Sequence, residues 1–511
     1  MDNKQSPCLP GASFEKYAYS ARKQEKLQGP AKNLAKLAKY DLCINKNGPE
    51  RLLLIDRIIM IDSLKSRYLW KAALSIAAIL GIVGCRAITH IFIPSSHLRG
   101  IPKVPTLSFL LSILKGNPFE ESCKKIIWPI IEKKGMASVW FLGRWGVFLS
   151  DPSDIKYFLS HTSDIPKVTT PKQSQFLINF FGKENVANSN GEEWRHHRKI
   201  LDPAFRHTIP TQCFGECAHE LFEYINLAIS QGVDVEIPLV MRRLTLDALG
   251  RGLFNFNFNA LQDPYNEYCK KYDGALKGMT NPFRLLFPSA EPLIALFDRQ
   301  SSQSLDELNK LFLGIIENRK KEIHQGLDEN INVQHKNLLD LMIDASIADV
   351  ERNWTATEIK NNLMVFFFAG HETTQAALSV SIYFLALHPE IQEIARQEVD
   401  RILANSDRMQ IPSVESCRSM KYIDCIIKES LRIYPPAPGI GPRVVENSVE
   451  IGGVMLPKGT YIIADVYTLH NSTKYWQDPE KFWPDRFLSE NHPPRDAWMP
   501  FGGGPRICVS F

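Results

Sequence analysis

The segment Phe501–Cys508, which reads Phe-Gly-Gly-Gly-Pro-Arg-Ile-Cys, constrains the fold of this chain more than any other stretch. Its three glycines let the backbone bend and approach a flat ligand closely. Arg506 places a fixed cation two residues before the thiol of Cys508, and such a cation suits a carboxylate. The alternative is a glycine-rich turn that contains an ordinary buried cysteine, but such a turn does not require this spacing. The segment therefore predicts a loop that holds a flat, acidic ligand against a cysteine.

Haem is the flat ligand that this pattern suits. A thiolate on haem iron pushes electron density toward the metal and favours O–O cleavage, which a histidine ligand does less well. Cys508 is therefore the candidate iron ligand, in a loop that also contains Phe501, Gly504 and Arg506.

A second motif, Ala369–Thr374, reads Ala-Gly-His-Glu-Thr-Thr. Its small residues leave room for a group to press against a helix backbone. Thr373 can bond to the carbonyl four residues back or open the helix to hold a water, and a hydroxyl beside the Glu372 carboxylate can relay protons. The alternative is a solvated glutamate beside an ordinary back-bonded threonine. A zinc-protease interpretation of His371 fails, because Gln375 stands where a second histidine is needed.

A third motif combines Glu429 and Arg432, which face the same way at i, i+3 spacing, with Arg486 in the segment Trp483–Phe487. The segment looks buried, so its arginine needs partners. Taken alone, a surface ion pair would explain the first two residues equally well.

A fourth motif places Trp194 and Arg198 one turn apart on one helix face. An indole N–H and a guanidinium at this spacing can clamp a carboxylate. A cationic amphipathic helix is the alternative interpretation.

The composition excludes several other classes. The chain has 511 residues, of which 44% are hydrophobic, and its 60 basic and 56 acidic residues give a net charge of +4. This balance argues against nucleic acid as a partner. The ten cysteines include no C-x-x-C pair, which excludes a zinc ribbon or a thioredoxin motif.

The chain is organised in three parts. We expect a polar, basic, poorly ordered arm over residues 1–67, a membrane anchor helix over 68–93 and one catalytic domain over 94–511. A buried core helix or an interfacial segment is the alternative for 68–93. Apolar residues at three- and four-residue spacing predict helices over 302–323 and 337–348, and a capping box at Thr355 and Glu358 predicts a helix that ends near Leu387. Short strands follow at 449–451, 454–456 and 461–466, so the fold class is mostly α with a small β portion (α+β).

The four motifs, in this order, resemble the cytochrome P-450 superfamily from a proline hinge near Arg99 to Ser510. The resemblance is to eukaryotic microsomal members rather than to soluble bacterial ones. It implies the cytochrome P-450 fold, without the elements that follow the cysteine ligand loop, and haem b (iron protoporphyrin IX) as the cofactor. It also implies a monooxygenase that inserts one oxygen atom from O2 into an apolar small molecule.

The resemblance further implies the partners. Electrons would come from a separate flavin-containing NADPH-dependent reductase, with cytochrome b5 as a further candidate donor. The enzyme would sit in the endoplasmic reticulum membrane with its catalytic domain facing the cytosol. Phe366, Phe367, Phe368 and Ile440 would line an apolar pocket, with helix-core packing as the alternative for the three phenylalanines.

The resemblance also implies the role of each site residue. Cys508 would be the axial haem-iron ligand, shielded by Phe501, and Glu372 and Thr373 the acid–alcohol pair of oxygen activation. The residues that would contact the haem propionates are Arg506, Arg443, Trp194 and Arg198. Those of a buried structural triad are Glu429, Arg432 and Arg486.

Two rival functions remain, and the ends of the chain bear on them. One is a reductase-independent isomerase or dehydratase of the same fold, and the other is a catalytically inactive, truncated relic. Ser510 stands where the family usually has glycine, and the sequence stops one residue later. The apolar segment lies about seventy residues from Met1, whereas Met60 would place it near a start. We therefore expect that both ends of this translation are wrongly placed.

Overall fold

The computed structural model describes residues 50–169, 175–207, 210–263, 265–325, 337–348, 354–403, 410–488 and 495–510. The chain divides into two compact units, Met1–Arg86 and Ala87–Phe511. In the first unit the description begins at Glu50 and is confined to the backbone as far as residue 67. Of the expected arm over 1–67, residues 1–49 lie outside the described residues.

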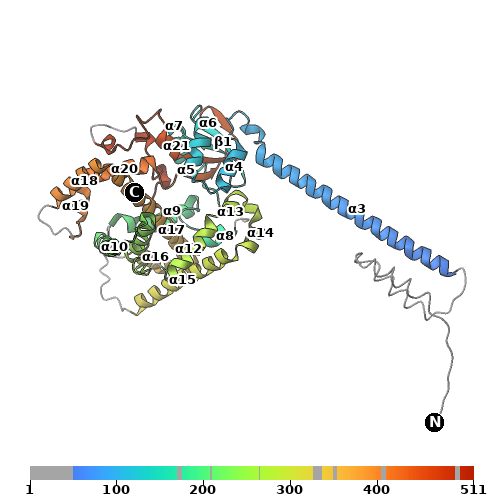
Figure 1. The fold of residues 1–511 in the computed structure, drawn as a ribbon, viewed down its shortest axis with the longest axis horizontal. Coiled ribbons are helices and arrows are strands. Elements are labelled where there is room, and N and C mark those ends of the chain that lie inside the picture. Colours follow the sequence, from blue (N-terminus) through green and yellow to red (C-terminus); the bar gives the residue numbers. More distant parts are fainter. Residues whose placement is uncertain are drawn as a thin grey trace, which may run out of the picture. The chain divides into compact units, whose positions relative to one another are not determined.

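The helix α3 spans Glu50–Phe92 (Figure 1). Its beginning differs from the expected anchor helix over 68–93, because the helix continues through the charged stretch before residue 68. The segment Tyr68–Leu98 begins inside α3 and ends six residues after it. By length and composition this segment could cross a membrane, and its mean hydropathy is 2.0. Among the described residues it is the one segment that meets both conditions.

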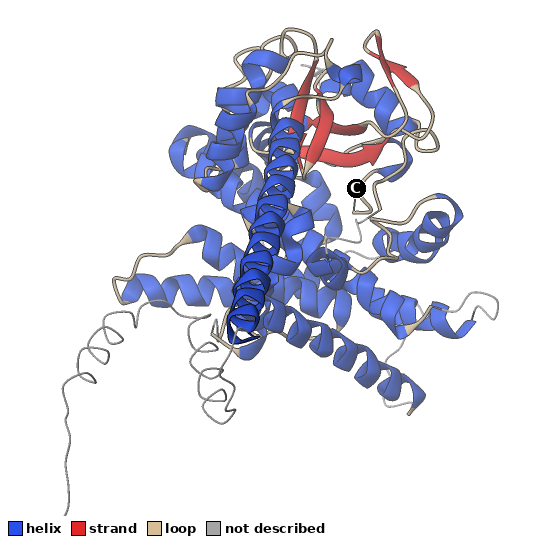
Figure 2. Cartoon of the chain, turned by 90° about the vertical axis from the view of Figure 1, so that its right-hand side faces the viewer, coloured by secondary structure: helices blue, strands red, loops and turns tan. Residues whose placement is uncertain are grey.

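The second unit is mostly helical, as expected (Figures 1 and 2). Its first helices are α4 (Thr106–Leu114), α5 (Phe119–Ser122), α6 (Trp128–Ile131), α7 (Pro152–Ser160), α8 (Gln175–Phe181), α9 (Gly191–His207), α10 (Thr211–Ser230), α11 (Ile237–Phe254), α12 (Glu267–Met279), α13 (Pro282–Leu286) and α14 (Glu291–Phe297). The later helices are α15 (Arg299–His324), α16 (Leu338–Ala348), α17 (Ala356–Leu387), α18 (Pro389–Ile402), α19 (Val414–Ser419), α20 (Lys421–Ile433) and α21 (Val466–Asn471).

The β portion consists of two small sheets, which gather at one side of the body in Figure 2. The strands are β1 (Met136–Phe141), β2 (Arg144–Leu149), β3 (Gly439–Val444), β4 (Val449–Ile451), β5 (Val454–Leu456) and β6 (Tyr461–Asp465). The larger sheet has the order β1-β2-β6-β3, in which β2 and β6 are parallel and the other pairs antiparallel. The smaller sheet is the hairpin β4-β5. These two strands and β6 correspond to the three strands predicted from the sequence.

The helix α17 runs through the main hydrophobic core and carries the second motif. The predicted capping box is formed, since the Thr355 hydroxyl accepts from the Glu358 N–H and the Glu358 carboxylate accepts from the Thr355 N–H. The first half of the helix packs into a cluster with α8, α11, α12, α15 and α16. Because this half is buried on nearly every side, the helix fixes the position of the motif that follows.

Candidate functional site

The loop before Cys508 turns the thiol toward solvent. Gly502 and Gly504 have φ values of 75° and 64°, which residues with a side chain rarely adopt. A Cβ on Gly504 would lie 2.8 Å from the carbonyl oxygen of Leu159, so this position also requires glycine for space. The Cys508 N–H donates to the Phe501 carbonyl at 3.0 Å, and the exposed thiol lies 3.1 Å from the Ser510 hydroxyl.

Four cations gather beside this loop. Arg443 and Arg506 come from the strand β3 and from the loop itself, while Lys167 and Arg198 come from the N-terminal half of the body. Burial, followed by the charges of Arg443 and Arg506, lowers the pKa of Lys167 to about 8. Burial, followed by the charges of Arg443 and Arg198, lowers the pKa of Arg506 to about 10. Arg198 is paired with Asp202, but the described residues show no ion pair for the other three cations, so the cluster carries a net positive charge.

The cluster also contains buried hydrogen-bond donors that have no acceptor among the described residues. Arg443 is 1% exposed and donates through Nη1 to the carbonyl of Phe158 at 2.7 Å, but its Nε and Nη2 have no partner among the described residues. Nη1 of Arg506 likewise has none there. Buried donors of this kind require an acceptor. An acidic ligand such as the two propionates of haem fits the cluster, since it supplies both the negative charge and the acceptors.

Trp194 and Arg198 do not form a simple clamp. Trp194 lies under the Arg506 guanidinium, 4.1 Å from it. Arg198 pairs through Nε with Asp202 at 2.7 Å and donates through Nη1 to the carbonyl of Ile507 at 3.2 Å. Trp194 thus contacts Arg506, and Arg198 contacts the backbone of the cysteine loop. Both residues belong to α9, which packs beside the loop in this way.

One face of α17 is exposed where the second motif lies. Ala369 and Thr373, four residues apart, are both exposed, whereas Phe367 and His371 on the opposite side are buried. The Thr373 hydroxyl donates to the Ala369 carbonyl at 2.6 Å, so the helix remains closed and the threonine is back-bonded. Val509, next to Cys508, packs on the same hydrophobic cluster as α17. The cysteine loop and the buried side of α17 thus belong to one hydrophobic cluster.

The carboxylate of Glu372 contacts side chains of α11 and α12. Its Oε1 accepts from the Tyr272 hydroxyl at 2.8 Å and lies 3.6 Å from Nη2 of Arg242. Neither partner was expected from the sequence.

Glu429 joins both arginines of the third motif. It accepts from Nε of Arg432 at 2.8 Å and from Nε of Arg486 at 3.0 Å, and all three residues are buried. It also accepts from the Trp483 N–H at 3.0 Å. Arg432 donates further to the carbonyls of His470 and Pro479, each at 2.8 Å. The three residues thus join α20 to the irregular segment before the cysteine loop.

The phenylalanines before the second motif belong mainly to the core. Phe366 and Phe367 are 6% and 1% exposed, and Phe367 packs on the rings of Phe254 and Tyr272. For these two residues the expectation of a pocket lining is wrong, because their side of α17 faces the helical core. Phe368 is half-buried and packs on Phe180 and Phe181. Ile440 is partly buried against the cluster of the sheet.

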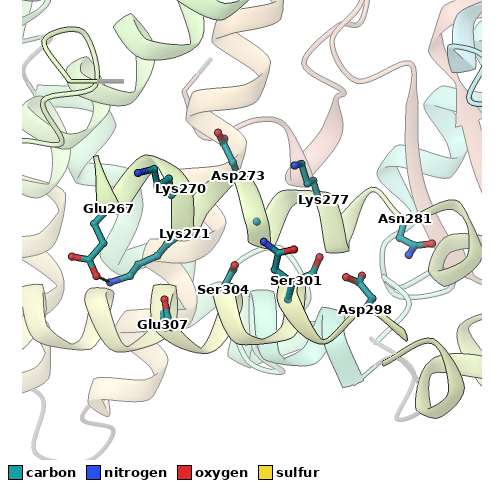
Figure 3. Close-up of a pocket in the computed structure, with 12 residues that line it drawn as sticks. Glu267, Lys270, Lys271, Asp273, Lys277, Asn281, Asp298, Ser301, Ser304 and Glu307 are labelled. Atoms are coloured by element: carbon teal, nitrogen blue, oxygen red, sulfur yellow. Dashed lines mark hydrogen bonds and ion pairs between the residues drawn. The ribbon is translucent and has the colours of Figure 1, made fainter. Parts of the chain in front are cut away.

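A separate pocket of about 770 Å³ opens between α12 and α15 (Figure 3). Its lining is largely charged and polar and includes Lys270, Lys277, Asp298 and Ser301. This lining does not suit the apolar substrate expected from the sequence.

Comparisons with known proteins point to one family. A family model described as cytochrome P-450 matches residues 102–509. The chain is 29% identical over 446 residues to cytochrome P-450 3A16 of Mus musculus, with 83% of each chain covered. It is 30% identical over 434 residues to cytochrome P-450 3A9 of Rattus norvegicus, with 81% of each covered.

A likeness in structure accompanies the likeness in sequence. The crystal structure of the cytochrome P-450DA heme domain matches with a TM-score of 0.66 and 23% identity. The match covers 80% of this chain and 87% of that one.

Proposed function

Because the chain belongs to the cytochrome P-450 family, and is thereby an oxidoreductase of the monooxygenase class, we propose that it inserts one atom of O2 into an apolar small molecule. Haem, a redox partner and a small-molecule substrate follow from the family. The finer assignments are part of the proposal: the cofactor is haem b, and the electron donor is a flavin-containing NADPH-dependent reductase, with cytochrome b5 as a second donor.

One observation carries the proposal. The exposed thiol of Cys508 lies in the same loop as Arg506, whose spare donor adds to those of the buried Arg443. A free thiol that can bind iron, beside buried cations with donors available for carboxylates, is the combination that a haem-thiolate site needs. No other ligand considered from the sequence uses both.

The residues then take the following roles. Cys508 would bind the haem iron through its sulfur, and the turn at Gly504 would bring the thiol to that position. Arg443 and Arg506 bind the propionates, with Arg198 and Lys167 adding charge beside them. Trp194 supports Arg506 from below, and Phe501 shields the thiolate. The neighbouring triad of Glu429, Arg432 and Arg486 is structural.

When bound, the haem supplies the activation of O2, with one oxygen atom transferred to substrate and the other released as water. The chain supplies the protons. Glu372 takes protons from solvent, and the Thr373 hydroxyl, freed from the Ala369 carbonyl, passes them on. We place the cofactor and the substrate beside the exposed face of α17 at Ala369 and Thr373.

We also propose a membrane location in the endoplasmic reticulum, with the catalytic domain over 94–511 in the cytosol. The apolar stretch Tyr68–Leu98 supports an anchor. Exposed leucines on α4 (Leu107 and Leu111) and exposed apolar residues on α14 (Leu296 and Phe297) support contact of the body itself with lipid. Both helices contact α13.

The test is the spectrum of the reduced, carbon monoxide-bound protein, followed by NADPH consumption with a reductase. A thiolate-type Soret band that disappears in Cys508→Ala, together with consumption and product, is the expected result. An unchanged band in Cys508→Ala would overturn the assignment of the ligand. A band without consumption would indicate the isomerase or dehydratase, and no band at all would indicate the inactive relic.

A further inference from the structure

The carboxylate of Glu372 is held by a residue of another helix. Tyr272, on α12, is 2% exposed, and its hydroxyl donates to Oε1 of Glu372 at 2.8 Å. Burial, and then the Glu372 charge, raise the pKa of Tyr272 well above its usual value. Tyr272 therefore keeps its proton and acts as a fixed donor, which sets the orientation of the Glu372 carboxylate.

A single cation is shared between two carboxylates beside this bond. Nη2 of Arg242, on α11, lies 2.8 Å from Oδ1 of Asp273 and 3.6 Å from Oε1 of Glu372. The Arg242 guanidinium also lies over the Tyr272 ring, 5.4 Å from its centre. The shorter of the two ion-pair distances is to Asp273, although Nη2 makes no hydrogen bond among the described residues. Glu372 therefore shares its counter-charge with Asp273.

The remaining neighbour of Glu372 is neutral. His371 is fully buried, and its Nδ1 lies 2.8 Å from the hydroxyl of Thr245. Burial and then the charge of Arg242 lower the pKa of His371 to about 3. Its Nε2 is 3.5 Å from Oε1 of Glu372. The charge balance at Glu372 is therefore set by Arg242 and, through it, by Asp273.

We propose that Tyr272 and Asp273 are positioning residues for proton delivery through Glu372. Tyr272 fixes the orientation of the carboxylate, and Asp273 draws Arg242 away so that the carboxylate can accept a proton. A proton from solvent binds to Glu372 and leaves it toward Thr373, while Tyr272 and Arg242 keep their own protons. The proposal rests on the function proposed above, since it assigns Glu372 a part in that reaction.

The removal of either residue has a distinct consequence. Without Asp273, Arg242 closes on Glu372 and stabilises its charged form, so the carboxylate accepts a proton only at lower pH. Without the Tyr272 hydroxyl, the carboxylate loses its fixed donor and its orientation. The two variants therefore impair proton delivery by different routes.

The same helix offers a matched control. In Figure 3 the Asp273 side chain points away from Ser301 and Ser304 of α15, whereas Glu267 points toward Lys271, with which it pairs. Glu267→Gln removes the same charge from α12 as Asp273→Asn does, but away from Arg242. Asp273→Glu restores the charge and serves as the conservative variant.

The experiment compares these variants in the haem-loaded, full-length chain. The first readout is the hydrogen peroxide released per NADPH across the pH range. The second is the infrared band of the protonated Glu372 carboxyl in the resting protein, identified by its loss in Glu372→Gln, which requires no turnover. In Asp273→Asn the midpoint of both pH profiles should move down by about one unit. Tyr272→Phe should raise peroxide release several-fold at all pH values, and Asp273→Glu should restore the parent profile.

Double variants test whether the effects pass through Glu372. In a Glu372→Gln background, Asp273→Asn and Tyr272→Phe should add no further peroxide. Parent-like profiles in both single variants, or an equal shift in Glu267→Gln, would overturn the proposal. If the parent forms no product, the proposed function fails. An infrared band that still moves in Asp273→Asn alone would then support the control of Glu372 separately from that reaction.

Discussion

The Thr373 hydroxyl donates to the carbonyl of Ala369 in the same helix, and its release from this bond is a requirement of the proposed proton relay. We expect Thr373→Ala to bind haem like the parent but to release more hydrogen peroxide per NADPH, because the relay hydroxyl is gone. The effect should be on the order of tenfold. Thr373→Ser keeps a hydroxyl and is the control. Tight coupling of NADPH consumption to product in Thr373→Ala would show that Thr373 is an ordinary helix residue.

For single residues, the sequence predicts which functional side chains are adjacent in the chain, but it does not predict their partners from distant segments. Glu372 and Thr373 stand side by side, so the pair could be proposed from spacing. Tyr272 is separated from Glu372 by 100 residues, and no local pattern marks it as a partner. Lys167 similarly joins the arginines of the cysteine loop through the fold alone. The three phenylalanines were ambiguous because a helix face cannot be assigned to core or pocket without its neighbours.

A buried carboxyl at the start of α21 makes that helix sensitive to pH. Asp465 is 1% exposed and accepts from the N–H and hydroxyl of Thr468, and burial raises its pKa from 3.8 to about 6. The protonated form is thus favoured by folding, so the stability that it contributes is complete below pH 3.8 and is lost as the pH rises through about 6.

We expect Asp465→Asn to remove this dependence and to stabilise the protein at neutral pH by on the order of 2 kcal/mol. The asparagine can keep both contacts with Thr468. Denaturant unfolding followed by circular dichroism between acidic and neutral pH measures the effect. A variant whose stability changes with pH as the parent's does would contradict it.

Substitution within the triad of Glu429, Arg432 and Arg486 should destabilise the protein strongly. Glu429→Gln leaves two buried guanidinium groups without their counter-charge, so we expect a loss of about 3–5 kcal/mol in the free energy of unfolding. The exposed Glu393→Gln on α18 is the control, with a change within about 0.5 kcal/mol. Equal unfolding midpoints for the two variants would show that the triad is not structural.

The start of α17 was predicted because the sequence carries a signal for it, whereas the start of α3 was not predicted. The capping box at Thr355 and Glu358 defines the start of α17 because both of its hydrogen bonds are local. The start of α3 at Glu50 carries no such signal. The apolar pattern begins only near residue 68, whereas a helix can continue through charged residues that hydropathy excludes.

For the whole molecule, attachment to lipid should depend on the apolar part of α3. We expect the full chain to float with phosphatidylcholine vesicles in a density gradient. The double variant Ile79→Lys and Ile82→Lys should not float, because each charge at the centre of a span costs about 3 kcal/mol. The double variant with leucine at both positions is the control. Flotation of the lysine variant would indicate that the exposed residues of α4 and α14 are sufficient for binding.

The fold class followed from the motifs, but the topology of the sheet did not. Short strands near 461 were visible as alternating apolar residues, whereas their pairing with residues 146–149 is a long-range contact that no local pattern specifies.

This pairing has a consequence for the timing of synthesis. The strand β2 leaves the ribosome early, and its parallel partner β6 follows roughly three hundred residues later. At about 5–20 residues per second, the edge of β2 waits for about 15 s to one minute before its partner exists. Over that interval the apolar strand β2 can pair only with β1, and its other edge is open to wrong partners. The newly made chain therefore depends on chaperones most strongly before its last fifth is translated.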